Sequence, residues 1–149
     1  MAGREELRAV PAASLHVTLV FLGSTPPAEV PRIWAAVPRD GPAPCFAAAE
    51  LVALPRRRPR VFALGLVDEA GRAAMLQRAI AEALGESGRR PWLPHVTLAR
   101  VRKGRRVSHL AGDAPRLDPF AAPGVALLRS HPGSRYELVE RAALGDQSS

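Results

Sequence analysis

Residues 16–19 read His-Val-Thr-Leu, and residues 95–98 repeat them letter for letter. Each copy lies in an apolar run that contains β-branched residues and is bounded by Gly or Pro, which predicts one strand over 15–22 and another over 95–101. Duplication of a structural unit is the simplest account of such a repeat. We therefore expect two related lobes, each presenting one copy of the motif.

The repeated residues place chemistry on one face of each predicted strand. Because side chains alternate along a strand, His16 and Thr18 share a face, and His95 and Thr97 do the same in the second copy. Two such strands related by a pseudo-twofold would line one surface with two imidazoles and two hydroxyls. An unperturbed imidazole titrates near neutrality and can act as acid or base, and hydroxyls can donate hydrogen bonds to phosphate oxygens. The residues predict metal-free cleavage of a phosphoester.

Three other interpretations of the motif are weaker. A single His-x-Thr is usually a half-exposed polar strand face, but its duplication favours a site. Two histidines without further His, Cys or carboxylate at ligand spacing do not supply the four ligands of a structural metal. A nucleophile role for Ser14 beside His16 lacks the strand–turn–helix context of a nucleophile elbow. We expect no metal and no cofactor.

The remaining pattern predicts an α+β domain of two lobes, each an antiparallel sheet with helices on its outer face, around a cleft lined by the motifs. The expected elements are a short helix over 28–37, strands over 45–54 and 61–67 that pair as a hairpin, a helix over 70–84, a loop over 102–119, and a closing hairpin of 125–129 with 136–144. Only 15 residues precede His16, too few for the strand and helix that precede the second copy.

Length and composition narrow the class of protein. A chain of 149 residues is long enough for one sizeable core and short for two domains, so 1–149 are expected to form one domain. No apolar run approaches the roughly 18 residues of a membrane span, and Cys45, the single cysteine, is expected to be a buried small hydrophobe. We expect a soluble cytoplasmic monomer.

The charge of the chain favours an anionic partner. The formal net charge is +7, and Lys103 is the single lysine, so arginines carry the excess. Such a balance is typical of nucleic-acid binding, although GC-rich coding would produce the same arginine excess. The arginines of 56–60 and 102–106 could follow an RNA backbone or lie in solvated turns.

Several segments together resemble the two-histidine phosphoesterase superfamily, and within it the RNA 2',3'-cyclic phosphodiesterases, historically called 2'-5' RNA ligases. These segments are the two motifs with Phe21-Leu22-Gly23, the run Pro-His-Val-Thr-Leu-Ala-Arg over 94–100, and the closing Arg129-Ser130 and Tyr136-Glu137. The resemblance runs over 7–144, and 145–149 are expected to be a disordered tail. The family normally begins with a strand and helix before the first motif, and the short start of this chain indicates that both are missing.

The resemblance implies a role for five residues. His16 and His95 would form an acid–base pair, and Thr18 and Thr97 would hold the phosphate. Arg100 follows the second motif where the family has a further anion clamp. Alternation from His95 puts Arg100 on the opposite face of the strand, where it would be a solvent-facing arginine, unless a bulge or the end of the strand changes its direction.

The implied reaction is hydrolysis of a 2',3'-cyclic phosphate at an RNA end, such as the end of a tRNA fragment, to a 2'-phosphomonoester. One histidine deprotonates the attacking water, the other protonates the departing ribose oxygen, and reversal of this chemistry gives 2'-5' RNA ligase activity. We favour His95 as base and His16 as acid, but the approximate symmetry leaves the assignment open. The alternatives are a non-catalytic RNA-binding module and a phosphodiesterase for small cyclic nucleotides or ADP-ribose cyclic phosphate.

Two aromatic residues and two further histidines complete the candidates. Trp92 and Phe46 could stack on bases, although core packing is favoured for each. His109 and His131 lie near Gly, Pro and Ser and are expected to be bystanders.

Overall fold

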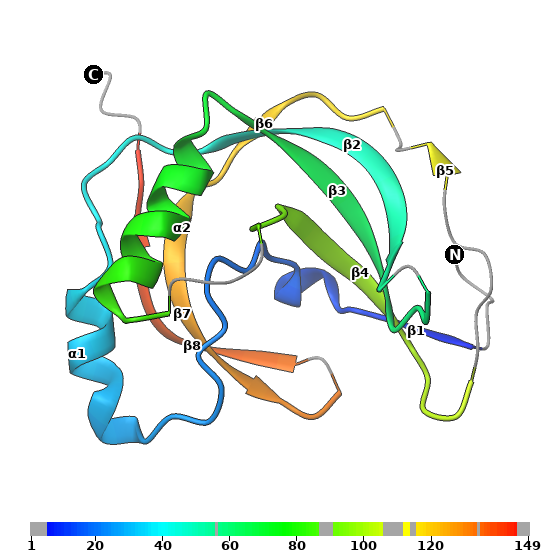
Figure 1. The fold of residues 1–149 in the computed structure, drawn as a ribbon, viewed down its shortest axis with the longest axis horizontal. Helices are drawn as coiled ribbons and strands as arrows, with labels where there is room; N and C mark the ends of the chain where they lie inside the picture. Colours follow the sequence, from blue (N-terminus) through cyan, green and yellow to red (C-terminus); the bar gives the residue numbers. More distant parts are fainter. Residues whose placement is uncertain are drawn as a thin grey trace.

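The chain folds into a large curled antiparallel sheet and a smaller two-stranded sheet, with both helices beside the small sheet (Figure 1). The computed structural model describes residues 6–55, 57–86, 91–105, 112–113, 116–133 and 135–145. In chain order the elements are β1 Leu7–Ala9, the 3-10 turns Ala12–Ser14 and Pro27–Glu29, α1 Val30–Ala35, β2 Cys45–Leu54, β3 Val61–Glu69, α2 Arg72–Ala83, β4 His95–Val101, β5 Gly112–Asp113, β6 Phe120–Ala121, β7 Gly124–His131 and β8 Arg135–Ala143. The α+β class with two antiparallel sheets is therefore confirmed.

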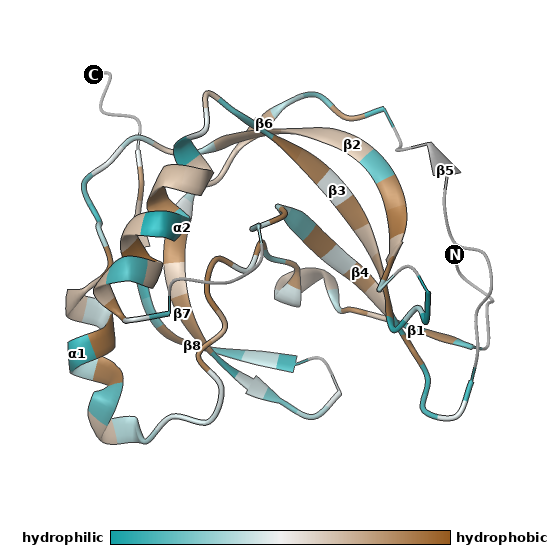
Figure 2. Cartoon of the chain, viewed as in Figure 1, coloured by the Kyte–Doolittle hydropathy of each residue, from teal (hydrophilic) through white to brown (hydrophobic). Residues whose placement is uncertain are grey.

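The two sheets differ in size. The large sheet has the strand order β1-β4-β3-β2-β5, with β6 also pairing with β2, and β7 pairs with β8 alone in the small sheet. The predicted hairpin of 45–54 with 61–67 is present as β2 and β3, and the predicted closing hairpin is present as β7 and β8. Hydrophobic colours predominate along β2 and β3 (Figure 2), as expected for strands that pack against the core.

Helix α2 has start and stop signals in its own sequence. Gly71 has a φ of 67° and precedes the helix, and the carboxylate of Asp68 accepts hydrogen bonds from the N–H groups of Ala73 and Ala74 at 3.0 and 2.8 Å. These two donors have no partner within the helix, so the carboxylate stabilises its first turn. Gly85, with a φ of 72°, follows the last turn in the left-handed conformation common there. The predicted helix over 70–84 is thus confirmed, slightly shortened.

Three apolar clusters form the core. One joins β1, β3 and β4 through Leu7, Phe62 and Ala99. A second packs α2 against β2 and β3: Phe46, Leu64, Leu66 and Ala73. The third packs α2 and the segment just after α1 against β7 and the segment after β8: Val37, Ile80, Val125 and Leu144. Since α2 belongs to two clusters, it fixes the small sheet relative to the large one, rather than covering one lobe alone.

The segment before the first motif differs from the sequence prediction. A strand does precede the motif, because β1 pairs with the second half of β4, and Val10 extends this pairing with an N–H that donates to the Leu98 carbonyl at 2.8 Å. Pro11 has no N–H to continue the ladder, and the chain leaves β4 through a 3-10 turn. It returns at Val17, which forms an isolated antiparallel bridge with Val96.

The predicted strand over 15–22 is therefore wrong except for this bridge. Leu19 and Val20 pack against the cluster around α2 and β7 instead of continuing a ladder along β4. Their β propensity is overridden by tertiary packing. Of the predicted tail 145–149, only Gly145 lies within the described residues.

Candidate active site

The two copies of the motif meet at equivalent residues. Val17 and Val96 are the second residues of their copies, and they pair in an antiparallel bridge. An antiparallel pair of equivalent residues has a local twofold axis between its strands. One step along this register places His16 across from Thr97 and Thr18 across from His95. The repeat therefore folds into a locally symmetric site, although the two sheets around it are unequal.

All five predicted site residues line one small cavity. The cavity has a volume of about 40 Å³, and its lining comes from the first motif, from β4, from β8 and from the segment before the first motif. The lining residues are Val10, Ser14, His16, Thr18, His95, Thr97, Arg100 and Tyr136. The side chains that the sequence places far apart thus share one concave surface.

Both imidazoles are held in the same way. The Nδ1 atom of His16 is 2.7 Å from the Ser14 carbonyl oxygen, and the Nδ1 atom of His95 is 2.8 Å from the Leu93 carbonyl oxygen. A carbonyl only accepts, so Nδ1 carries the proton and donates in both rings. In a neutral ring Nε2 is then a basic lone pair, and in a protonated ring it is an acidic N–H. The backbone therefore fixes the tautomer in which each Nε2 can exchange a proton with a ligand.

Arg100 joins the pocket because β4 has a bulge. Two consecutive residues of β3 pair with Ala99 and Thr97, which leaves Leu98 as an extra residue on β4. One extra residue reverses the alternation of side chains, so Arg100 lies on the face that carries Thr97 and lines the same cavity. The bulge that the sequence analysis required for this position is present.

Tyr136 is a pocket residue to which sequence reasoning assigned no role. Its ring meets the edge of the His16 ring with centroids 4.5 Å apart and an interplanar angle of 70°. Its hydroxyl accepts a hydrogen bond from Arg100 Nη2 at 3.3 Å. Tyr136 thus connects the imidazole to the guanidinium. Tyr136 is the single tyrosine of the chain, and it lies in the closing segment that carries part of the family resemblance; these were the signals that could have drawn attention to it.

The threonines and Trp92 complete the arrangement. Within the described part of the chain, neither the Thr18 nor the Thr97 hydroxyl has an intramolecular hydrogen-bond partner, so both can donate to a ligand. The indole N–H of Trp92 donates to the Thr18 carbonyl at 2.9 Å, and its ring packs against the cluster that contains Phe46. Trp92 therefore anchors the first motif beside the second, as core packing rather than as a stacking platform. Phe46 is a core residue at 2% exposure.

The other sequence candidates lie outside the pocket. His131 pairs with Glu137 at 3.0 Å on the β7–β8 hairpin. A hydrogen bond from His131 and the Arg129 charge hold the pKa of Glu137 below its usual value.

Desolvation and the Glu69 carboxylate raise the pKa of the half-buried Cys45 thiol. Three further candidates lie outside the described residues: Arg56, Arg106 and His109.

The described residues contain neither a metal-binding cluster nor a membrane-spanning helix. No group of three or more His, Cys, Asp or Glu side chains could hold a metal ion in the part of the chain that the structure describes. No helix among the same residues is long and apolar enough to span a bilayer.

Comparison with known proteins identifies the family. The sequence profile of the 2'-5' RNA ligase superfamily matches residues 3–130. The chain is similar to TT0787 of Thermus thermophilus, with 26% identity and a TM-score of 0.68 over 96% of this chain and 85% of that one. It is similar to E. coli LigT complexed with 3'-AMP, with 25% identity and a TM-score of 0.71 over 95% of this chain and 83% of that one.

A third solved structure, described as a phosphoesterase, has 24% identity and a TM-score of 0.70 over 95% of this chain and 83% of that one, and it shares the fold. No curated protein sequence matches the chain. The profile match covers most of the chain, including both motifs and the start of the closing hairpin. The chain therefore belongs to the 2'-5' RNA ligase superfamily of two-histidine phosphoesterases, enzymes that act on phosphodiester bonds.

Proposed function

We propose that this protein hydrolyses 2',3'-cyclic phosphate ends of RNA to 2'-phosphomonoesters without a metal ion. The observation that carries the proposal is the shared cavity in which two imidazoles, each with Nδ1 bonded to a carbonyl, stand beside two hydroxyls and one guanidinium. The superfamily of the chain, and the 3'-AMP bound to the similar E. coli LigT, support a ribonucleotide substrate.

The mechanism uses the two Nε2 atoms in opposite protonation states. One imidazole takes a proton from water as the water oxygen bonds to phosphorus, and the P–O3' bond breaks. The other imidazole gives its proton to O3', which leaves the phosphate on O2'. Proton exchange with solvent restores both rings. A 5'-hydroxyl in place of water would join two ends by a 2'-5' bond, which is the ligase activity in the family name.

The other three groups stabilise the charge on phosphorus. Thr18 and Thr97 donate hydrogen bonds to non-bridging oxygens, and Arg100 adds a permanent positive charge. These groups are in place before the reaction, so they need not reorganise as negative charge develops. Local symmetry lets either histidine serve as base, and we favour His95 in that role.

Phosphorus NMR tests the proposal directly. A dinucleotide that ends in a 2',3'-cyclic phosphate is incubated with the protein and EDTA. We expect the cyclic phosphate signal to be replaced by that of a 2'-monoester, at the same rate with and without the chelator. A 3'-monoester product, or activity lost to EDTA, would contradict the mechanism.

The same assay separates the alternatives. Salt-sensitive RNA binding with no turnover would indicate a non-catalytic binding module. Faster turnover of a cyclic mononucleotide or of ADP-ribose cyclic phosphate than of the dinucleotide, when the substrates compete, would assign the cavity to small cyclic phosphates.

A further inference from the structure

Two arginines lie side by side at the edge of the large sheet. Arg8 on β1 and Arg100 on β4 are register partners in the antiparallel pair. Residues directly opposite each other in such a pair point to the same face, with Cα atoms about 5 Å apart. The two side chains therefore leave the sheet together, on the face where Arg100 reaches the catalytic cavity.

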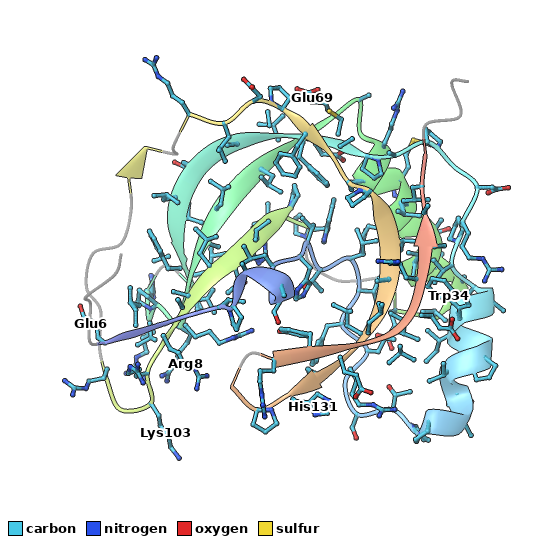
Figure 3. The ribbon with its side chains drawn as sticks, turned by 180° about the vertical axis from the view of Figure 1, so that it is seen from behind. Glu6, Arg8, Trp34, Glu69, Lys103 and His131 are labelled. Atoms are coloured by element: carbon cyan, nitrogen blue, oxygen red, sulfur yellow. The ribbon has the colours of Figure 1, made fainter. Side chains whose placement is uncertain are left out.

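Both arginines extend toward the β7–β8 hairpin. Arg100 donates to the Tyr136 hydroxyl on β8. The Nη1 atom of Arg8 lies near the hairpin turn, 4.0 Å from the position that a Cβ at Gly133 would occupy. Figure 3 shows Arg8 in the same lower part of the view as the hairpin end, which His131 marks. The pair thus spans the gap between the large sheet and the hairpin.

The position of Arg8 relative to the cavity sets its role apart from that of Arg100. Arg100 lines both the small catalytic cavity and the wider cleft beside it, whereas Arg8 lines only the wider cleft. A ligand phosphate held by the two histidines would therefore contact Arg100. A second negative group, further along the same ligand, would lie between Arg100 and Arg8.

No acidic group among the described residues pairs with either arginine. Among the residues that the structure describes, Arg8 has no hydrogen bond or ion pair, and Arg100 bonds to a neutral phenol. Guanidinium groups are always protonated, and like charges directly opposite each other in a sheet are unfavourable. An anion between them would relieve this repulsion, and the planar, multiple donors of arginine fit a phosphodiester.

We propose that Arg8, together with Arg100, binds the phosphodiester that precedes the cyclic phosphate. This inference rests on the proposed function and gives its substrate class: an RNA oligonucleotide with at least one internucleotide phosphate, rather than a cyclic mononucleotide. The catalytic cavity holds the terminal phosphate, and the arginine pair holds the next phosphate along the strand.

The test compares two substrates that differ by one phosphate. kcat/KM is measured for a cyclic-phosphate dinucleotide and for a cyclic mononucleotide, with wild type and with Arg8→Gln. We expect Arg8→Gln to lower kcat/KM for the dinucleotide about tenfold, as for the loss of one charge-assisted hydrogen bond, mainly through KM. The mononucleotide should change by less than about twofold, since it has no group at this subsite.

Salt dependence gives an independent readout of the same contact. Each phosphate contact with a single strand contributes about 0.7 to the slope of log affinity against log salt concentration. The slope for the dinucleotide should fall by about this amount in Arg8→Gln. Arg78→Gln removes the same charge from an exposed position on α2 and should leave both substrates unchanged.

The outcomes separate this inference from the proposed function. Equal losses on both substrates, or no loss on either, would overturn the subsite. If wild type hydrolyses neither substrate, the proposed function fails. The subsite is then tested by equilibrium binding of the corresponding 2'-phosphorylated dinucleotide and mononucleotide, with the same expected difference between wild type and Arg8→Gln.

Discussion

Replacing either motif histidine with alanine should remove nearly all activity while the protein stays folded. In each ring Nδ1–H donates to a backbone carbonyl, with an N···O distance of 2.7 Å for His16 and 2.8 Å for His95. Nε2 of each ring is therefore the nitrogen available for proton transfer. One positioned proton transfer contributes about 10²- to 10⁴-fold, which corresponds to about 2.7–5.4 kcal/mol at 1.36 kcal/mol for each tenfold. Neither histidine belongs to an apolar cluster of the core, so the substitutions should cost little stability.

The two effects should not add. Both proton transfers serve one displacement at phosphorus, so the second substitution removes little once the first is made. We therefore expect the double variant to be about as slow as the slower single variant. Because the threonines and Arg100 remain, KM for the dinucleotide should change much less than kcat.

Steady-state kinetics with the cyclic-phosphate dinucleotide measures these effects, and circular dichroism checks the fold. His131→Ala is the matched control, since His131 is an exposed histidine paired with Glu137 outside the catalytic cavity. It should keep wild-type kcat. A His16 or His95 variant that retained more than about a tenth of wild-type kcat would refute the acid–base assignment.

Three further predictions test the surroundings of the site. Trp92→Phe keeps an aromatic ring in the core but loses the N–H that donates to the Thr18 carbonyl. The free energy of unfolding should fall by about 0.5–1.5 kcal/mol, and kcat should fall by a larger factor than KM rises. An unchanged kcat, measured where the variant is fully folded, would show that the position of Thr18 does not depend on this bond. Gly124→Ala would place a Cβ 2.5 Å from the Ala142 carbonyl oxygen. Urea denaturation should therefore show that the free energy of unfolding falls by about 1–3 kcal/mol. An unchanged free energy of unfolding would mean that β8 can shift away from the new Cβ without cost. The raised pKa of Cys45 keeps its thiol protonated at neutral pH, so iodoacetamide should react more slowly than with free cysteine at pH 8 and faster as pH rises; reaction as fast as free cysteine would contradict this.

The sequence made the side chains of the candidate site predictable because their signal is local. An identical His-x-Thr in two places needs no tertiary information to be noticed, and strand alternation relates each histidine to its threonine. The helix over 72–83 was equally predictable, since the glycines at its ends and its apolar spacing are encoded within a short stretch. Arg100 was predictable only conditionally, because a bulge depends on the neighbouring strand as well as on its own residues.

Other features depend on partners far away in the chain. The segment 15–22 has the composition of a strand, but apolar contacts with α2 and β7 take its side chains away from a ladder. Tyr136 lies beside His16 and Arg100 because the fold brings β8 next to the first motif and β4. Arg8 lies opposite Arg100 because β1 pairs with β4 in this register.

By itself, the sequence determined which groups form the candidate site. The repeated tetrapeptide contains the two imidazoles and two hydroxyls, and periodicity sets their faces, because both features depend on a few neighbouring residues. Only the tertiary structure decided how those groups meet: the antiparallel bridge between equivalent valines, the carbonyls that fix both tautomers, and the two arginines on one face. These depend on which strands pair and in which register, and register is set by packing over the whole domain rather than by any local stretch.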